Sequence, residues 1–96
     1  QSGGFVGPDD RPLVGAAGIA KLKDDSRVRL VGFVVKSLGD EKYEFSDDSG
    51  TVVVEIDDED WNGIEVSPGL RVEIAGEVDK DWRDVEVEVD NIRIAD

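Results

Sequence analysis

Apolar and polar residues alternate along most of the chain after Arg27, and this period of two is typical of β-strands. The inward positions of the pattern carry mainly valine and isoleucine, whereas many outward positions carry charged side chains. Turn-forming sequences such as DDSG and SPG separate the alternating segments. The pattern predicts an all-β protein with strands at residues 27–37, 41–46, 51–57, 70–79 and 84–94.

Two glycines interrupt these strands. Gly32 lies in the middle of the first segment, and Gly76 falls on the inward face of the fourth. Glycine inside a strand is typical of a sharp bend or of a close approach between backbones. Five strands with two such bends fit a small closed barrel, because closure removes the free edges of a sheet. We therefore predict a five-stranded OB-fold, which is a Greek-key barrel.

The last segment changes phase near its middle. Its valines occupy one parity of the alternation, whereas Ile92 and Ile94 occupy the other. A slip of one residue turns a strand's apolar side chains to the opposite face. We therefore predict a β-bulge near residues 90–91, which would return both isoleucines to the barrel interior.

The region before the first strand is predicted to contain one short helix. Residues 1–13 are rich in glycine, proline and polar groups and are interpreted as a flexible arm, although Phe5 and Val6 could also pin it to a groove. Small and apolar residues at helical spacing predict the helix at residues 15–22. A single OB-fold domain is expected to occupy residues 14–96, with room for one further helical turn between the third and fourth strands.

Charge and composition narrow the classes of partner. The 96 residues include 24 acidic and 11 basic side chains, which gives a formal net charge of -13, and the basic residues are scattered. Binding to nucleic acids or anionic membranes is therefore disfavoured, because both need clustered cations. The chain has no cysteine and no apolar run near the roughly 20 residues of a membrane span. We expect a monomer that has no cofactor and does not insert into membranes.

Four sequence segments resemble those of a known family. GGFVGP, DDSGTVVVEID, WNG and GEVDKDW occur in an order and spacing similar to the bacterial OB-fold (BOF) family, the small secreted stress-tolerance proteins of Gram-negative bacteria. The resemblance covers Gly3 to about Ile94. It implies an OB-fold barrel, a mature chain without its signal peptide, a periplasmic location and a role in envelope stress tolerance. It also implies peptidoglycan sugars as a ligand, and it supplies no catalytic residues. The chain lacks methionine, which agrees with removal of an N-terminal leader.

Catalysis is disfavoured by the residue types that the chain lacks. It has no histidine and no cysteine, so the commonest general base and the thiol nucleophile are missing. No serine lies in a GxSxG or SxxK motif. Pairs of carboxylates at a catalytic spacing are expected by chance in so acidic a chain. We predict a protein that is not an enzyme.

The connection between the last two strands is the first candidate binding site. Ligands of OB-folds meet the face of the second and third strands and the two flanking loops. Trp82 could stack on a sugar ring while neighbouring polar groups bind hydroxyls, or it could pack under its own loop instead. The candidate ligand-binding residues are Asp79, Lys80, Trp82 and Arg83 in this connection, with Glu55 and Lys36 on the strand face.

A run of acids before Trp61 is the second candidate. Asp57, Asp58 and Asp60 are weak candidates for a metal site, since hard cations prefer oxygen ligands. The other interpretation, which we favour, is a solvated corner where Trp61 folds back to close one end of the barrel. No metal site is therefore predicted outright.

Two functions remain open at this point. The first is a binding module for a small envelope ligand such as peptidoglycan fragments. The second is an acidic protein that binds or buffers cations or cationic peptides. This second function is suggested by the outward glutamates of the last two strands. These glutamates repel one another, and bound cations would relieve the repulsion. Those same glutamates could instead protect a sheet edge from aggregation. They are Glu73, Glu77, Glu86 and Glu88.

Overall fold

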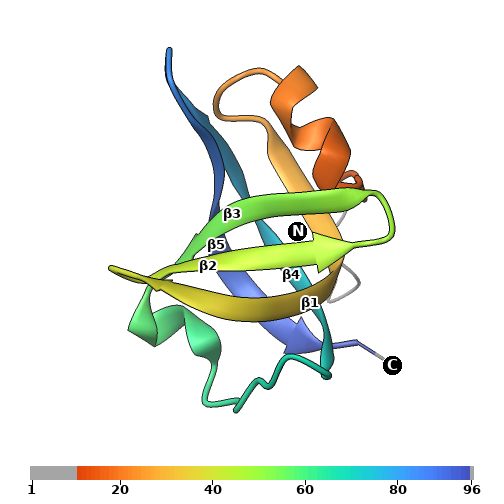
Figure 1. Cartoon of the computed structure of the whole chain (residues 1–96), viewed down its shortest axis with the longest axis vertical. Helices are drawn as coiled ribbons and strands as arrows, with labels where there is room; N and C mark the ends of the chain where they lie inside the picture. The colour runs from red at the N-terminus through yellow and green to blue at the C-terminus, as the bar shows by residue number, and fades with distance from the viewer. Residues whose placement is uncertain (1–10, 96) are drawn as a thin grey trace, which may run out of the picture.

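Five β-strands close into a barrel in the computed structural model, which describes residues 11–95 (Figure 1). The strand order is β1-β2-β3-β5-β4, with β4 pairing back onto β1. β3 and β5 run parallel, whereas the other neighbours are antiparallel. This arrangement confirms the predicted OB-fold barrel. The strands are β1 (Arg27–Gly39), β2 (Lys42–Asp47), β3 (Gly50–Ile56), β4 (Arg71–Lys80) and β5 (Val85–Ile94).

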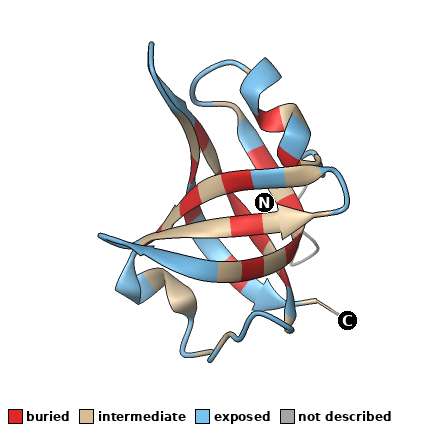
Figure 2. Cartoon of the chain, viewed as in Figure 1, coloured by how far each residue is buried: buried red, intermediate tan, exposed pale blue. Residues whose placement is uncertain are grey.

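The barrel interior is filled by the inward positions of the alternating pattern (Figure 2). Phe45 is the largest of the fully buried side chains, and it is surrounded mainly by valine, isoleucine and leucine. Each such aliphatic side chain contributes roughly 1.5–3 kcal/mol on full burial. Ile92 is 1% exposed, as expected, but the expectation that Ile94 also reaches the interior is wrong. Ile94 is 49% exposed, because it lies at the end of β5 beyond the packed interior.

The predicted bulge is present on β5. Ala75 pairs with Asn91 and Gly76 pairs with Val89, so Asp90 has no partner in the ladder. The extra residue restores the phase of the strand and allows Ile92 to reach the core. The bend also brings the two backbones together, since a Cβ built on Gly76 would lie 2.1 Å from the carbonyl oxygen of Glu88.

The predicted N-terminal helix is a 3-10 helix, η1 (Ala16–Lys21). It covers one end of the barrel with the fully buried Ile19, and its first turn is held by the β2–β3 turn. Asp47 Oδ2 accepts a hydrogen bond from the Ala16 N–H at 2.9 Å, and Ser49 Oγ accepts one from the Ala17 N–H at 3.0 Å. These contacts fix the position of η1 beside β3.

The opposite end of the barrel carries the second short helix, η2 (Asp58–Trp61), which is the single turn expected between β3 and β4 (Figure 1). Trp61 is partly buried against the core, and its ring meets that of Tyr43 edge to face at 5.3 Å between centroids. The interpretation of Trp61 as a plug is therefore confirmed. Neither η1 nor η2 has the length and apolar character needed to span a bilayer.

The predicted flexible arm is only partly covered by the structure. Residues 1–10, including Phe5 and Val6, lie outside the described residues. The next three residues run parallel to β1, because Pro12 O accepts a hydrogen bond from the Arg29 N–H at 2.8 Å. Arg11 also forms an ion pair with Asp90 at 3.1 Å. Ordered contacts with the barrel therefore begin before residue 14.

Candidate functional site

The β4–β5 loop is a tight turn organised by one carboxylate. Asp81 Oδ1 accepts hydrogen bonds from the backbone N–H groups of Asp84 and Arg83, both at 2.8 Å. The Asp81 N–H in turn donates to the Asp84 carbonyl at 3.0 Å. The two hydrogen bonds to the carboxylate lower the pKa of Asp81, because they favour its charged form. The loop thus presents its next two side chains on a defined backbone.

Trp82 projects from this turn into solvent. Its side chain is 87% exposed, so the interpretation that it packs under its own loop is wrong. The guanidinium carbon of Arg83 lies 5.0 Å from the centroid of the indole ring, within cation–π range. An open hollow of about 190 Å³ lies beside the ring, between the loop and Ala20 of η1. We call the indole, Arg83 and this hollow the Trp82 platform.

Lys80 connects the platform to the end of η1 through hydrogen bonds. Its Nζ donates to the carbonyl oxygens of Ala20 at 2.9 Å and Leu22 at 3.2 Å, and its backbone N–H donates to Asp24 Oδ1 at 2.8 Å. The lysine therefore joins the end of η1 to the end of β4. Lys80, Trp82 and Arg83 come together around the hollow as the sequence suggested, but the Lys80 ammonium group is engaged with backbone carbonyls.

The remaining predicted binding residues lie away from the platform hollow. Asp79 is exposed on β4 and pairs across the sheet with Glu86. Lys36 is exposed on β1, with its Nζ 3.7 Å from a carboxylate oxygen of Glu44. Glu55 faces outward on β3 and belongs to a different cluster. The platform hollow is therefore lined by only some of the residues that were predicted to bind the ligand.

A second hollow, of about 330 Å³, adjoins the platform along η1, and we call it the side groove. It lies between η1 and the outer face of β2 and β3, and it shares Ala20 and Val85 with the platform. The sequence did not predict this groove, because alanine has no functional group that would indicate a binding site. Only the packing of η1 against the barrel places its alanines along the groove. Its lining residues are Ala16, Ala17, Ile19, Ala20, Glu44, Thr51, Val52, Val53 and Val85.

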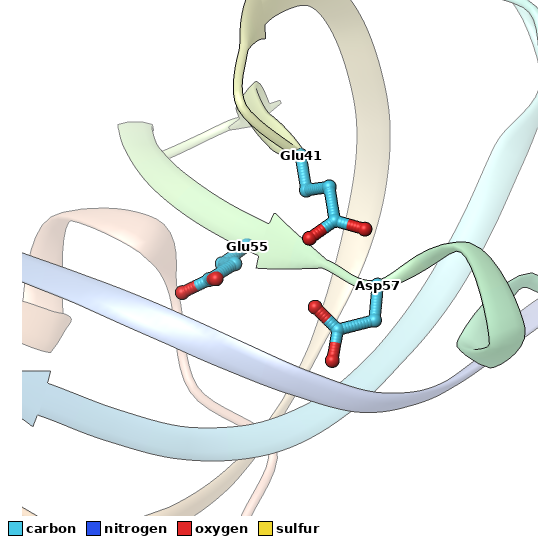
Figure 3. Close-up of side chains that lie close together, drawn as sticks. All are labelled: Glu41, Glu55 and Asp57. Atoms are coloured by element: carbon cyan, nitrogen blue, oxygen red, sulfur yellow. The ribbon is translucent and has the colours of Figure 1, made fainter.

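Three carboxylates gather at the opposite end of β3 (Figure 3). Glu41 lies in the β1–β2 turn, Glu55 lies on β3, and Asp57 directly follows that strand. One oxygen of each lies within 4.8 Å of the others. We call this group the acidic triad.

The acidic triad includes one of the three weak candidates for a metal site. Within residues 11–95, Asp57 is the one member of the predicted set that belongs to it, whereas Asp58 and Asp60 are in η2. Adjacent residues point in different directions, so convergence comes from strand pairing instead. The Ile56 N–H donates to the Glu41 carbonyl at 2.9 Å, which holds the β1–β2 turn against the end of β3. The pairing register of the β2–β3 hairpin, which places Lys42 opposite Glu55, could have indicated this contact from the sequence.

The Glu41 carboxylate of the triad has a raised pKa. The backbone N–H of Asp58 donates to the Glu41 carboxylate and favours its charged form. Burial and the neighbouring carboxylates of Asp57 and Asp58 outweigh that bond and raise the pKa of Glu41.

Most of the outward glutamates on β4 and β5 have basic partners. Glu73 contacts Arg29 at 3.3 Å and Arg93 at 3.0 Å, and Glu86 contacts Lys42 at 2.7 Å. Hydrogen bonding to Glu86 raises the pKa of Lys42. The repulsion predicted among the glutamates is thereby reduced. The edge-protection interpretation is wrong, because β4 and β5 are paired on both sides in the closed barrel.

Repulsion persists at Glu88. It lies across from Glu77 on β4 and from Glu55 on β3. Burial, followed by the charges of Glu55, Asp79, Asp57 and Glu77, raises the pKa of Glu88. A negative surface thus extends from the acidic triad across β5.

Comparison with known proteins places this barrel in a family context. Residues 1–94 match the family described as "Bacterial OB fold (BOF) protein". The chain is 46% identical to Protein YgiW of Escherichia coli K12 over 105 residues, covering 97% of this chain and 81% of that protein. It is 37% identical to the calcium-regulated OB-fold protein CarO of Pseudomonas aeruginosa, covering 95% and 79% of the two chains. The solved structure of E. coli YgiW superposes with a TM-score of 0.83 and 45% identity, covering 98% of this chain and all of that one.

Proposed function

Since the chain belongs to the bacterial OB-fold (BOF) family, we propose that it is a monomeric periplasmic binding module that acts in envelope stress tolerance. The proposed ligand is a fragment of the peptidoglycan sugar chain, bound at the Trp82 platform. The observation that carries this proposal is the indole ring, which is 87% exposed beside an open hollow.

The chemistry of the platform supports a sugar. The flat indole can stack on the apolar face of a pyranose, and the Arg83 guanidinium beside it can donate to hydroxyl or acyl oxygens. Asp81 holds the loop, so little conformational entropy is lost on binding. A net charge of -13 disfavours nucleic acid as the ligand. A binding role also agrees with the absence of histidine and cysteine from the sequence.

Titration with purified muropeptides in 0.3 M NaCl tests this proposal. Stacking should survive this salt, whereas surface charge attraction is screened beyond a Debye length of roughly 6 Å. We expect chemical-shift changes in the NMR signals of residues 81–84 and of the Trp82 indole N–H. Signals of the distant Trp61 ring serve as the internal control. Binding that leaves the 81–84 signals unchanged, or no binding at all, would reject the platform as the glycan site.

A second candidate function is cation binding by the acidic triad, supported by the 4.8 Å grouping of its three carboxylates. Carboxylate oxygens are the ligands that Ca²⁺ prefers, and three carboxylates could supply up to half a dozen of them, with water completing the shell. The relative in P. aeruginosa is named for regulation by calcium, which makes Ca²⁺ the first cation to test.

Calcium should raise the melting temperature of the protein at low ionic strength. At ten times the dissociation constant, a single site adds about 1.4 kcal/mol to the free energy of unfolding, which corresponds to a rise of about 5 °C or more. The variant Glu55→Gln should lose most of this rise. Glu65→Gln, which alters an exposed glutamate outside the triad, should retain it. An equal rise in both variants would mean that the triad is not the site, and no rise would exclude calcium binding.

A further inference from the structure

The Trp82 platform continues directly into the side groove. The two hollows meet at Ala20 and Val85, which line both of them. The platform hollow alone, at about 190 Å³, is smaller than the roughly 300–1,000 Å³ of typical ligand sites. The side groove adds about 330 Å³ and brings the combined site into that range. The combined shape is elongated, because it follows η1 from the β4–β5 loop to the outer face of β3.

The wall of the side groove is held in place at both ends of η1. Asp47 and Ser49 bind the first backbone N–H groups of the helix, at 2.9 and 3.0 Å. Lys80 binds carbonyl oxygens at its last turn, at 2.9 and 3.2 Å. The groove is therefore formed before any ligand arrives. Lys80 acts as a positioning residue for this wall.

The side chains of the groove determine what can occupy it. Three alanines keep it open on the η1 side, while Thr51 and Glu44 supply polar groups from β2 and β3. Glu44 is the one charged residue in its lining, so an anionic chain is disfavoured. An extended peptide cannot add to β3 as a new strand, because β3 is already paired with β2 on one side and β5 on the other.

We propose that the platform and the side groove form one site for a linear, N-acetylated glycan of at least two sugar rings. This inference rests on the proposed function above and extends it. One ring stacks on Trp82, and the next lies along η1, where the exposed methyl groups of Ala17 and Ala20 can contact acetyl methyl groups. Affinity should therefore increase with chain length, because a single ring leaves the side groove empty.

Calorimetric titration with β-1,4-linked N-acetylglucosamine oligomers in 0.3 M NaCl tests the inference. We expect the tetrasaccharide to bind at least tenfold more tightly than the monosaccharide. Ala17→Leu places a larger side chain in the side groove without touching the platform, so it should abolish the gain with length. Gly18→Leu is the matched control, because a Cβ at this neighbouring position meets nothing within 4 Å and lines neither hollow.

The outcomes separate this inference from the proposed function. Equal affinity for the monosaccharide and the tetrasaccharide, with both dependent on Trp82, would overturn the extended site and leave the platform as a single-ring site. A length gain that survives Ala17→Leu would also overturn it. No glycan binding at any length would remove both proposals. Thr51→Phe, which fills the same groove from β3, gives the same readout if Ala17→Leu unfolds the protein.

Discussion

Replacing Gly76 with alanine should lower the free energy of unfolding by about 3 kcal/mol or more. The new Cβ would lie 2.1 Å from the Glu88 carbonyl oxygen and 2.9 Å from the Val89 Cα, so the clash is with backbone atoms that no rotamer change can relieve. β4 and β5 would have to separate at the bulge that restores the phase of β5. Urea denaturation followed by tryptophan fluorescence or circular dichroism measures the loss.

Two further glycine variants make this result specific. Gly69→Ala should change the free energy of unfolding by less than about 0.5 kcal/mol, because its Cβ meets nothing within 4 Å. Gly32→Ala should be nearly as damaging as Gly76→Ala, since its Cβ would lie 2.3 Å from the Ser46 carbonyl oxygen. Wild-type stability in Gly76→Ala would show that the bend does not require the close approach of β4 to β5.

The barrel could be predicted from the sequence because its determinants are local and repetitive. Alternation fixes which face of each strand is buried, and the phase change at Ile92 revealed the bulge at Asp90. The inward glycines marked the places where backbones come together. All of these signals are carried within single segments, so no knowledge of distant contacts was needed to interpret them.

The sites were less predictable because they depend on contacts between distant segments. The acidic triad forms only because the β1–β2 turn lies against the end of β3, which brings Glu41 to Asp57. The position of η1 is fixed by Asp47 and Ser49, which lie some 30 residues farther along the chain. Lys80 was interpreted as a binding residue, yet its ammonium group is engaged by carbonyls at the end of η1. The sequence supplied the residue types for these sites, and the fold decided which of them meet.

Trp61 and Trp82 illustrate the same limit. Both follow acidic residues, and either could close an end of the barrel or meet a ligand. Trp61 packs against the core and the ring of Tyr43, whereas Trp82 is 87% exposed. The difference arises from their loops. Asp81 folds the β4–β5 turn so that Trp82 points outward, while η2 leads Trp61 back over the interior.

The variant Trp82→Ala should therefore lose binding without losing stability. Removing the stacking surface should weaken the affinity for N-acetylated glycan fragments by at least about tenfold, as expected for an aromatic anchor at the centre of a site. The free energy of unfolding should stay within about 0.5 kcal/mol of wild type, because the side chain is exposed. Calorimetric titration and urea denaturation of the same preparation measure the two quantities.

Trp61→Ala is the matched control, because it removes the same side chain from the opposite end of the barrel. Loss of a packed indole should cost about 2 kcal/mol or more in the free energy of unfolding, while the remaining folded protein binds glycan with unchanged affinity. Trp82→Phe should restore part of the affinity that Trp82→Ala loses, since a smaller ring can still stack. If Trp82→Ala binds glycan as tightly as wild type, the exposed indole has no part in recognition, and the glycan must contact another surface of the barrel.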